Sequence, residues 1–375
     1  MSFPHESEFI PYGCQEITQS DIDSVIKVLK SSNLTQGPTI PKFEEAVAKK
    51  VNSKYGIAVN SATSALHLAC RALSLGKNDW LWTSPTSFVA SANCGLYCGA
   101  KVDFVDIDPS TGLISIDHLK TKLEHAYVQN KLPKILVVVH LAGTSCDMKS
   151  IKELSDKYKF FILEDASHAL GAKYFNNYVG CCEYSSISVF SFHPVKIITT
   201  GEGGLITTND KQIAEKIYDL RSHGIVKEQT RLFETESSPW IYEQQDLGYN
   251  YRMTDIQAAL GLSQLERLDD IVVKRNRILN LYKDLVSDLP VYFLSIPPNS
   301  YSSVHLAVIN LRHPDETLHL KLFNFLRFNN IGVQIHYIPI HLQPFYKNLG
   351  FKKGDFPNAE LYATNAISLP VFPNL

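Results

Sequence analysis

Apolar residues in the first three quarters of the chain follow two alternating patterns. Short runs rich in branched and aromatic residues predict buried strands at 56–60, 80–83, 102–107, 135–140, 160–164, 187–192 and 204–208. Between them, apolar residues recur at three- and four-residue spacing, which predicts helices such as 63–75, 117–128, 148–158 and 210–223. Strands that alternate with helices predict an α/β fold whose sheet is mainly parallel and covered on both faces.

The pattern changes after residue 250. From 254 to about 289 the apolar residues keep a helical spacing, which predicts one long helix. Runs at 291–294, 304–310 and 333–338 then predict strands around a helix at 317–328. We therefore expect a large domain at 1–250, a connecting helix at 251–289 and a small α+β domain at 290–375. The stretch 227–248 lacks a clear period, which is typical of an exposed loop or a subunit contact.

Composition and charge exclude several classes of protein. Hydrophobic residues make up 45% of the 375 positions, so a disordered chain is excluded. A net charge of -2, with no long run of either sign, argues against nucleic-acid binding. The beginning of the chain lacks the features of a signal peptide and no apolar run could span a bilayer, which predicts a cytoplasmic protein without membrane contact. The seven cysteines are scattered without paired zinc-ligand spacing, which predicts reduced thiols and no metal site.

Lys196 is the strongest candidate for covalent chemistry. A predicted strand leads into the segment S-F-H-P-V-K at 191–196, and the glycine-rich turn G-E-G-G at 201–204 follows it. A lysine in such apolar surroundings is a candidate for a lowered pKa and for a covalent bond to a carbonyl group. The alternative is an ordinary surface lysine, as most lysines of this chain are expected to be.

Asp165 ends the apolar run at 160–164 and is followed by A-S-H-A-L-G at 166–171. Pyridoxal phosphate needs a lysine for its aldehyde and a carboxylate that keeps its ring nitrogen protonated. Asp165 and Lys196 meet that requirement if both follow strands that face one cleft. The alternative is that Asp165 is the N-cap of a helix.

Two further segments suit a phosphorylated aromatic cofactor. Small hydroxyl residues at 60–64 open a predicted helix directly after a strand, as at a phosphate site, although plain N-capping explains them equally well. Ser191 adds a hydroxyl group five residues before Lys196. Phe88 follows a turn at a predicted helix start and could stack on a planar ring, while its ordinary role would be in the core.

These segments, in this order, resemble the DegT/DnrJ/EryC1/StrS family of sugar aminotransferases. The similar segments are L-T-Q-G at 34–37, N-S-A-T-S-A-L at 60–66, V-H-L-A-G at 139–143, E-D-A-S-H-A-L-G-A at 164–172, L-R-S-H-G at 220–224, G-Y-N-Y-R at 248–252 and Q-I-H-Y at 334–337. They span nearly the whole chain. The resemblance implies a fold type I, aspartate-aminotransferase-like architecture that uses pyridoxal 5'-phosphate.

The resemblance also implies a role for each matching position. Lys196 would bond to the cofactor and move the proton, Asp165 would pair with the ring nitrogen, and His168 would lie near the ring oxygen. The remaining cofactor contacts would be Ala62, Thr63 and Ser191 at the phosphate, Phe88 on the ring face, and Asn250 contributed across a homodimer. Substrate contacts would come from Tyr12, Thr35, His336, Tyr337 and His341.

Within the family, the segments are most similar to the branch that acts in pseudaminic acid biosynthesis. This likeness implies transfer of an amino group from L-glutamate to C4 of a UDP-linked 4-keto-6-deoxy-N-acetyl-hexose. A related 4-aminotransferase on another nucleotide sugar, such as a GDP-linked one, is the main alternative. A dehydratase branch replaces the lysine by histidine, and Lys196 argues against it. A non-catalytic protein on this fold would be expected to have lost Lys196, Asp165 or the phosphate segment.

The resemblance carries one expectation about length. Members of the family usually continue past the equivalent of 368–375 into a final helix. We therefore expect either a truncated sequence or a small domain that lacks this helix.

Overall fold

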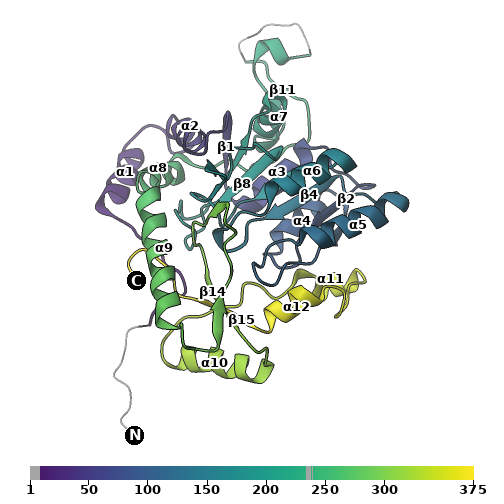
Figure 1. The fold of residues 1–375 in the computed structure, drawn as a ribbon. Coiled ribbons are helices and arrows are strands. Elements are labelled where there is room, and N and C mark those ends of the chain that lie inside the picture. Colours follow the sequence, from purple (N-terminus) through teal and green to yellow (C-terminus); the bar gives the residue numbers. More distant parts are fainter. Residues whose placement is uncertain (1–8, 234–237, 239) are drawn as a thin grey trace.

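A seven-stranded sheet forms the centre of the computed structural model, which describes residues 9–233, 238 and 240–375 (Figure 1). Its strand order is β1-β9-β8-β5-β4-β2-β3. The strands are β1 (Tyr55–Val59), β2 (Trp80–Thr83), β3 (Lys101–Phe104), β4 (Ile135–Val139), β5 (Phe161–Asp165), β8 (Ile187–Ser191) and β9 (Gly204–Thr208). Each lies within about three residues of a predicted run, because a strand buried on both faces is a continuous apolar segment.

One strand of this sheet runs against the others. β3, β2, β4, β5 and β8 pair in parallel, whereas β9 pairs antiparallel with both β8 and β1. The prediction of a mainly parallel sheet is thus confirmed. The parallel arrangement brings the carboxyl ends of β4, β5 and β8 to one edge of the sheet, where Asp165 ends β5 and Ser191 ends β8.

Helices cover both faces of the sheet (Figure 1). The helices of the first 250 residues are α1 (Gln19–Leu29), α2 (Thr39–Val51), α3 (Ala62–Ala72), α4 (Ala90–Tyr97), α5 (Ile116–Val128), α6 (Met148–Tyr158) and α7 (Lys211–Arg221). One core cluster joins Ile57 and Ile206 of the sheet to Leu66 of α3, and another joins Ala58 and Leu205 to α2. Alternate residues of β1 and β9 therefore face opposite cores.

The predicted helix at 251–289 is wrong in one respect, because two helices occupy that stretch. α8 (Asp255–Leu265) packs on α1 and α2, and α9 (Leu268–Leu285) follows after a break. The side chain of Arg267, next to the break, bonds to Asp21 near the start of α1. Figure 1 shows α9 running along the side of the molecule from α8 towards the C-terminal elements.

A second, three-stranded sheet lies below the large one (Figure 1). It consists of β12 (Val291–Phe293), β14 (Ala307–Leu311) and β15 (Ala366–Leu369), with α10 (Glu316–Phe328), α11 (Pro344–Asn348) and α12 (Pro357–Ala363) between β14 and β15. The predicted strand at 333–338 is wrong: this stretch forms turns with one isolated bridge, between Gln334 and Ser368. β14 pairs with β12 on one side and with β15 on the other. The apolar pattern did not predict β15.

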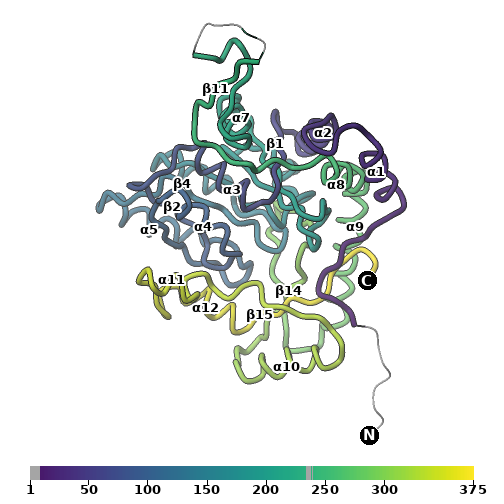
Figure 2. Tube along the Cα trace, turned by 180° about the vertical axis from the view of Figure 1, so that it is seen from behind, coloured from purple at the N-terminus to yellow at the C-terminus, as the bar shows by residue number. Residues whose placement is uncertain are grey.

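Short elements complete the fold. β6 (Lys173–Tyr174), β7 (Asn177–Tyr178) and β13 (Ser300–Tyr301) form one small sheet, and β10 (Ile225–Val226) pairs with β11 (Glu243–Gln244). β11 falls in the predicted loop at 227–248 and β10 directly precedes it; residues 234–237 and 239 of this loop lie outside the described residues. From behind, the N-terminal segment runs beside the C-terminal one (Figure 2), and the amide of Val371 donates to the Tyr12 carbonyl at 3.1 Å. Among the described helices, none is long and apolar enough to cross a membrane.

Candidate active site

A cavity of about 470 Å³ opens at the carboxyl edge of the large sheet. It lies between the ends of β5 and β8 and the start of α3. His305, which precedes β14, and His336 and Tyr337, which follow α10, also line it. Ten of the thirteen predicted site residues line it: Tyr12, Ala62, Thr63, Phe88, Asp165, His168, Ser191, Lys196, His336 and Tyr337. These residues are spread over 326 positions of the sequence, from 12 to 337, so the fold alone brings them together.

Lys196 lies in the turn after β8 and reaches into the cavity. Its backbone amide donates to the His193 carbonyl at 2.9 Å, and its Nζ lies 3.5 Å from Nε2 of His305. Burial lowers the pKa of the Lys196 amine to about 8, although the Asp165 carboxylate acts in the opposite direction. A substantial fraction of the amine is therefore neutral slightly above neutral pH, as a nucleophile or a base requires.

Asp165 is buried, and donors hold both of its carboxylate oxygens. Ser91 of α4 donates to Oδ2 at 2.6 Å, and the amide of Ser167 donates to Oδ1 at 3.2 Å. The alternative role as a helix N-cap is wrong, because turns and no helix follow Asp165 in the described stretch 166–172. The carboxylate is thus fixed at the cavity wall with an orientation set by its neighbours.

The start of α3 offers free amide groups to the cavity. Ser61 is the N-cap, and its side chain accepts from the amide of Ser64 at 3.1 Å. In the described part of the chain, the amides of Ala62 and Thr63 have no acceptor, as is usual in the first turn of a helix. A Cβ on Gly204 would lie 2.6 Å from the Ala62 nitrogen, so the glycine lets β9 pass directly against the helix start. Free amides at a positive helix end suit an anion such as phosphate.

A group of histidines and tyrosines forms another part of the cavity wall. Tyr337 Oη lies 3.1 Å from His168 Nε2, and the His168 ring centroid lies 4.2 Å from that of His305. Burial, followed by the charge of Lys196, holds the pKa of His168 well below its usual range. The same two causes lower the pKa of His336 to about 4. These imidazoles are therefore neutral near pH 7.

Two aromatic side chains lie towards the entrance of the cavity. Phe88 is 59% exposed, and its ring centroid lies 6.4 Å from that of Tyr337. The alternative core role for Phe88 is wrong, because a core side chain would be covered. Tyr12 lies on the N-terminal segment, with its ring centroid 5.2 Å from that of His336.

Three predicted site residues lie away from the cavity. His341 is fully buried, and its Nε2 lies 2.9 Å from Oε1 of Glu360, so the structure does not support the expected substrate contact. Thr35 is exposed and forms an isolated bridge with Thr254. Asn250 is also exposed and forms a bridge with Ser222. An exposed position is consistent with a contact that a second subunit would complete.

Sequence reasoning missed some residues that the structure places at the site. His305 contacts Lys196, Ser91 bonds to Asp165, and Glu202 of the glycine-rich turn lines the cavity. Glu202 lies in the glycine-rich turn at 201–204 and Ser91 lies three residues after Phe88, so their polarity was an available signal. His305 precedes β14 in an apolar stretch, and no local pattern distinguished it from an ordinary core residue.

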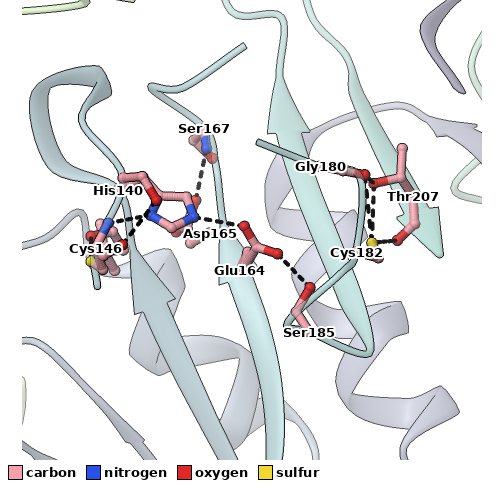
Figure 3. A network of polar contacts seen from close by, with 11 residues as sticks. His140, Cys146, Glu164, Asp165, Ser167, Gly180, Cys182, Ser185 and Thr207 are labelled. Atoms are coloured by element: carbon pink, nitrogen blue, oxygen red, sulfur yellow. Dashed lines mark hydrogen bonds and ion pairs between the residues drawn. The ribbon is translucent and has the colours of Figure 1, made fainter. Parts of the chain in front are cut away.

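A second polar network lies next to the cavity on the other face of β5 (Figure 3). His140 Nε2 lies 2.8 Å from Oε2 of Glu164, and the amide of Cys146 donates to His140 Nδ1 at 3.2 Å. Because Nδ1 accepts, the ring proton lies on Nε2 and is donated to Glu164. Ser185 donates to the other oxygen of Glu164. This network is closed, since each of these side-chain polar atoms has a partner.

The chain is similar to known proteins over nearly its whole length. Residues 15–375 match the model of the DegT/DnrJ/EryC1/StrS aminotransferase family. The UDP-4-amino-4,6-dideoxy-N-acetyl-beta-L-altrosamine transaminase of Campylobacter jejuni (strain 81-176) is 40% identical over 364 residues, which is 96% of this chain and 92% of that one.

Solved structures agree with this similarity. Helicobacter pylori PseC, described as an aminotransferase involved in the biosynthesis of pseudoaminic acid, has a TM-score of 0.89 at 34% identity and covers 98% of this chain and 95% of its own. Spr1654 from Streptococcus pneumoniae, solved in a PLP form, has a TM-score of 0.88 at 27% identity, with 98% and 94% covered.

Proposed function

The chain belongs to the DegT/DnrJ/EryC1/StrS aminotransferase family, and we propose that it transfers the amino group of L-glutamate to C4 of a UDP-linked 4-keto-6-deoxy-N-acetyl-hexose. The product would be UDP-4-amino-4,6-dideoxy-N-acetyl-β-L-altrosamine, the compound in the name of the Campylobacter jejuni relative. The observation that carries the proposal is the buried Lys196 amine, with its lowered pKa, in one cavity with Asp165. A lysine that only stabilised the fold would not need an open cavity around its amine.

The residues of the cavity fit pyridoxal phosphate. The free amides of Ala62 and Thr63 would hold the phosphate together with Ser191, Asp165 would pair with the ring nitrogen, and Phe88 would cover the ring. When bound, this cofactor supplies a carbonyl group for amines and an electron sink for the bond that breaks at the amino-bearing carbon. The position of Gly204 supports the phosphate site, because any larger residue there would press on the Ala62 amide.

The side chains of this cavity have separate tasks in the reaction. Lys196 would hold the cofactor through its amine and, when that amine is free, Nζ would take up the proton that leaves the amino-bearing carbon of the donor and later supply the proton that the carbon of the acceptor gains. Its pKa of about 8 suits both tasks near neutral pH. The carboxylate of Asp165, held by Ser91 and Ser167, would pair with the ring nitrogen. Tyr12, His336 and Tyr337 line the same cavity and are proposed to contact the sugar substrate.

We further propose that the enzyme is a homodimer. Asn250 and the paired strands β10 and β11 lie outside this cavity, and Phe233 and Trp240 beside these strands are 81% and 80% exposed. In this arrangement Asn250 of one subunit would complete the phosphate site of the other. The proposed organisation remains a large domain at 1–250, a connecting region at 251–289 and a small domain at 290–375.

Absorbance spectra test the cofactor assignment. Purified protein incubated with pyridoxal phosphate should acquire a visible band that L-glutamate removes and that Lys196→Ala does not form. A matched control is Lys211→Ala, since Lys211 lies on α7 with its side chain 74% exposed. A parent protein that stays colourless would contradict the cofactor assignment.

A substrate panel tests the sugar. Turnover with L-glutamate should be measured on UDP- and GDP-linked 4-keto-6-deoxy sugars, each with and without the N-acetyl group. We expect the UDP-linked N-acetyl sugar to have the highest kcat/KM. A preference for the GDP-linked sugar would contradict the proposed substrate and leave the aminotransferase reaction intact.

A further inference from the structure

The amine of Lys196 has a polar neighbour, His305, that has no task in the proposed reaction. Nε2 of His305 lies 3.5 Å from Nζ, and it is the one hydrogen-bond partner of this amine among the described residues. The distance is at the long end of the hydrogen-bond range, as is common in active sites before substrate binds. His305 is thus the group placed to set the direction of the Lys196 amine.

The position of the His305 ring is fixed by its surroundings. The side chain is 4% exposed, its backbone amide donates to the Ala142 carbonyl at 2.9 Å, and its ring packs against His168. A Cβ on Gly143 would lie 3.0 Å from the His305 nitrogen and 2.9 Å from the His168 carbonyl oxygen. The glycine thus lets the three segments approach closely, and the His305 ring has little room to turn away from Lys196.

The other ring nitrogen of His305 has no partner. Nδ1 is buried and lacks a hydrogen bond within the part of the chain that the structure describes. In a neutral imidazole one nitrogen carries the proton and the other accepts. Nε2 faces Lys196, whose amine has N–H groups in both of its protonation states, as an ammonium group and as a neutral amine. With the ring proton on Nδ1, Nε2 therefore accepts a hydrogen bond from Nζ in either state.

We propose that His305 is a positioning residue that holds the Lys196 amine in both of its protonation states by accepting a hydrogen bond from Nζ at Nε2. The inference rests on the proposed function, in which Lys196 gives up and regains a proton during each turnover. An acceptor at this position suits both the ammonium group and the neutral amine, so the contact need not break when the proton moves. His305 keeps the amine directed at the same place throughout.

The charges around this pair keep His305 neutral. Burial, then His168 and Lys196, hold the pKa of His305 well below its usual range. The titratable and charged groups that face the two residues are Asp165, His168, Arg275, His336 and Tyr337. Asp165 is the carboxylate of this group. Its negative charge acts to raise the pKa of Lys196, whereas burial lowers it by more.

Chemical labelling of the cofactor-free full chain tests the proposal. The rate at which acetic anhydride modifies Lys196, followed by peptide mass spectrometry, reports the pKa of its amine. His305→Leu removes the acceptor of the buried ammonium group, so we expect that pKa to fall by about one unit. His305→Gln, whose amide can donate or accept, should recover most of this shift.

The control for this experiment is His341→Gln, because His341 is also buried but bonds to Glu360 away from the cavity. It should leave the Lys196 pKa unchanged. An unchanged or raised pKa in a folded His305→Leu variant overturns the proposal, and so does a shift of the same size in the control.

Nitrogen NMR of protein labelled with ¹⁵N-histidine provides a measurement without any change at His305. In the parent protein, the ring proton should stay on Nδ1 and the shift of Nε2 should move as Lys196 titrates near pH 8. In Lys196→Met, the Nε2 shift should stay constant over the same range. A ring proton on Nε2, or a constant Nε2 shift, in the parent overturns the proposal. Neither measurement depends on catalysis, so a failure of the proposed function would be seen separately, in the absorbance and turnover experiments.

Discussion

Glu164 and Asp165 are consecutive acids at the end of β5, and they are almost equally buried, at 5% and 6% exposure. Because neighbouring residues of a strand point to opposite faces, they lie in different surroundings. Glu164 meets His140 and Ser185 beside a cavity of about 20 Å³. Asp165 meets Ser91 in the wall of the cavity of about 470 Å³ that contains Lys196. Two carboxylates at nearly the same depth therefore have different surroundings, a closed polar network on one face and the candidate active site on the other.

The two faces also differ in how completely their polar atoms are bonded. On the Glu164 face, both ring nitrogens of His140 have partners. On the Asp165 face, Nδ1 of His168 and Nδ1 of His305 have none within the described residues. Leaving a buried polar atom unpaired costs about 1–3 kcal/mol. Because the Glu164 network is closed and the Asp165 face lines the cavity, we expect mutations on the two faces to separate activity from stability.

The largest effect is expected from Lys196→Met on the Asp165 face. Transfer of the amino group from L-glutamate should fall by at least about 10⁴-fold, the upper end of what a positioned proton-transfer group contributes. Stability should not fall, because the variant removes a buried amine that burial disfavours. Conversion of L-glutamate to 2-oxoglutarate and thermal unfolding measure the two effects. A variant that keeps more than about one per cent of the activity would contradict the role of Lys196 in proton transfer.

On the Glu164 face, His140→Ala should act on stability instead. The variant leaves the Glu164 carboxylate buried without its imidazole partner, so the free energy of unfolding in urea should fall by about 4 kcal/mol. Turnover per folded molecule should stay within about threefold of the parent, because the partners of His140 and Glu164, namely each other, the Cys146 amide and Ser185, do not line the cavity.

A double variant checks the cause of that loss. Replacing His140 and Glu164 together by leucine removes both polar partners, so it should be less destabilised than His140→Ala alone. If the double variant were the less stable of the two, the cost would come from lost packing and the comparison of the two faces would fail.

The pH dependence of stability isolates the buried lysine. The pKa of Lys196 is about 8 in the folded protein, against a usual value of 10.5, so the unfolded chain binds more protons between these values. The parent should therefore gain stability relative to Lys196→Met as pH rises from about 8 to about 10.5, by about 3 kcal/mol in total. Below pH 8 the difference in stability between the parent and Lys196→Met should not change with pH. Urea unfolding of both proteins across this range measures it, and parallel curves would rule out a lowered pKa.

The smallest effect is expected from Ser91→Ala, which removes one donor from Asp165. Pyridoxal phosphate should bind about tenfold more weakly, because the carboxylate loses a fixed orientation worth about 1.4 kcal/mol. Ser110→Ala is the control, since Ser110 also donates to an aspartate, Asp108, but at an exposed site. Equal affinities of parent and Ser91→Ala in a fluorescence titration would show that Ser167 suffices to orient Asp165.

The apolar pattern predicted the large sheet well and the C-terminal part less well. The predicted bounds of β2 and β9 agree with the structure, because a strand buried on both faces is a continuous apolar run. The pattern does not contain strand direction, so the reversal of β9 was not predictable. It also missed the break between α8 and α9, because neither glycine nor proline marks that position.

The error at 333–338 has a physical reason. His336 and Tyr337 face the cavity, so the stretch is apolar and aromatic because of the site and not because it belongs to a sheet. β15, which takes the place beside β14, is four residues long and too short to show a period.

The sequence by itself determined the chemical groups and the strand ends that present them. Asp165 ends β5 and Lys196 lies in the turn after β8, and neighbouring parallel strands bring such residues together at one edge of the sheet. The tertiary structure alone decided which other groups complete the site. It placed His305, 109 positions after Lys196, against that amine, set Ser91 on Asp165 and left His341 bonded to Glu360. Local patterns report on neighbours along the chain, whereas the state of a buried polar group depends on partners that only the folded chain brings near.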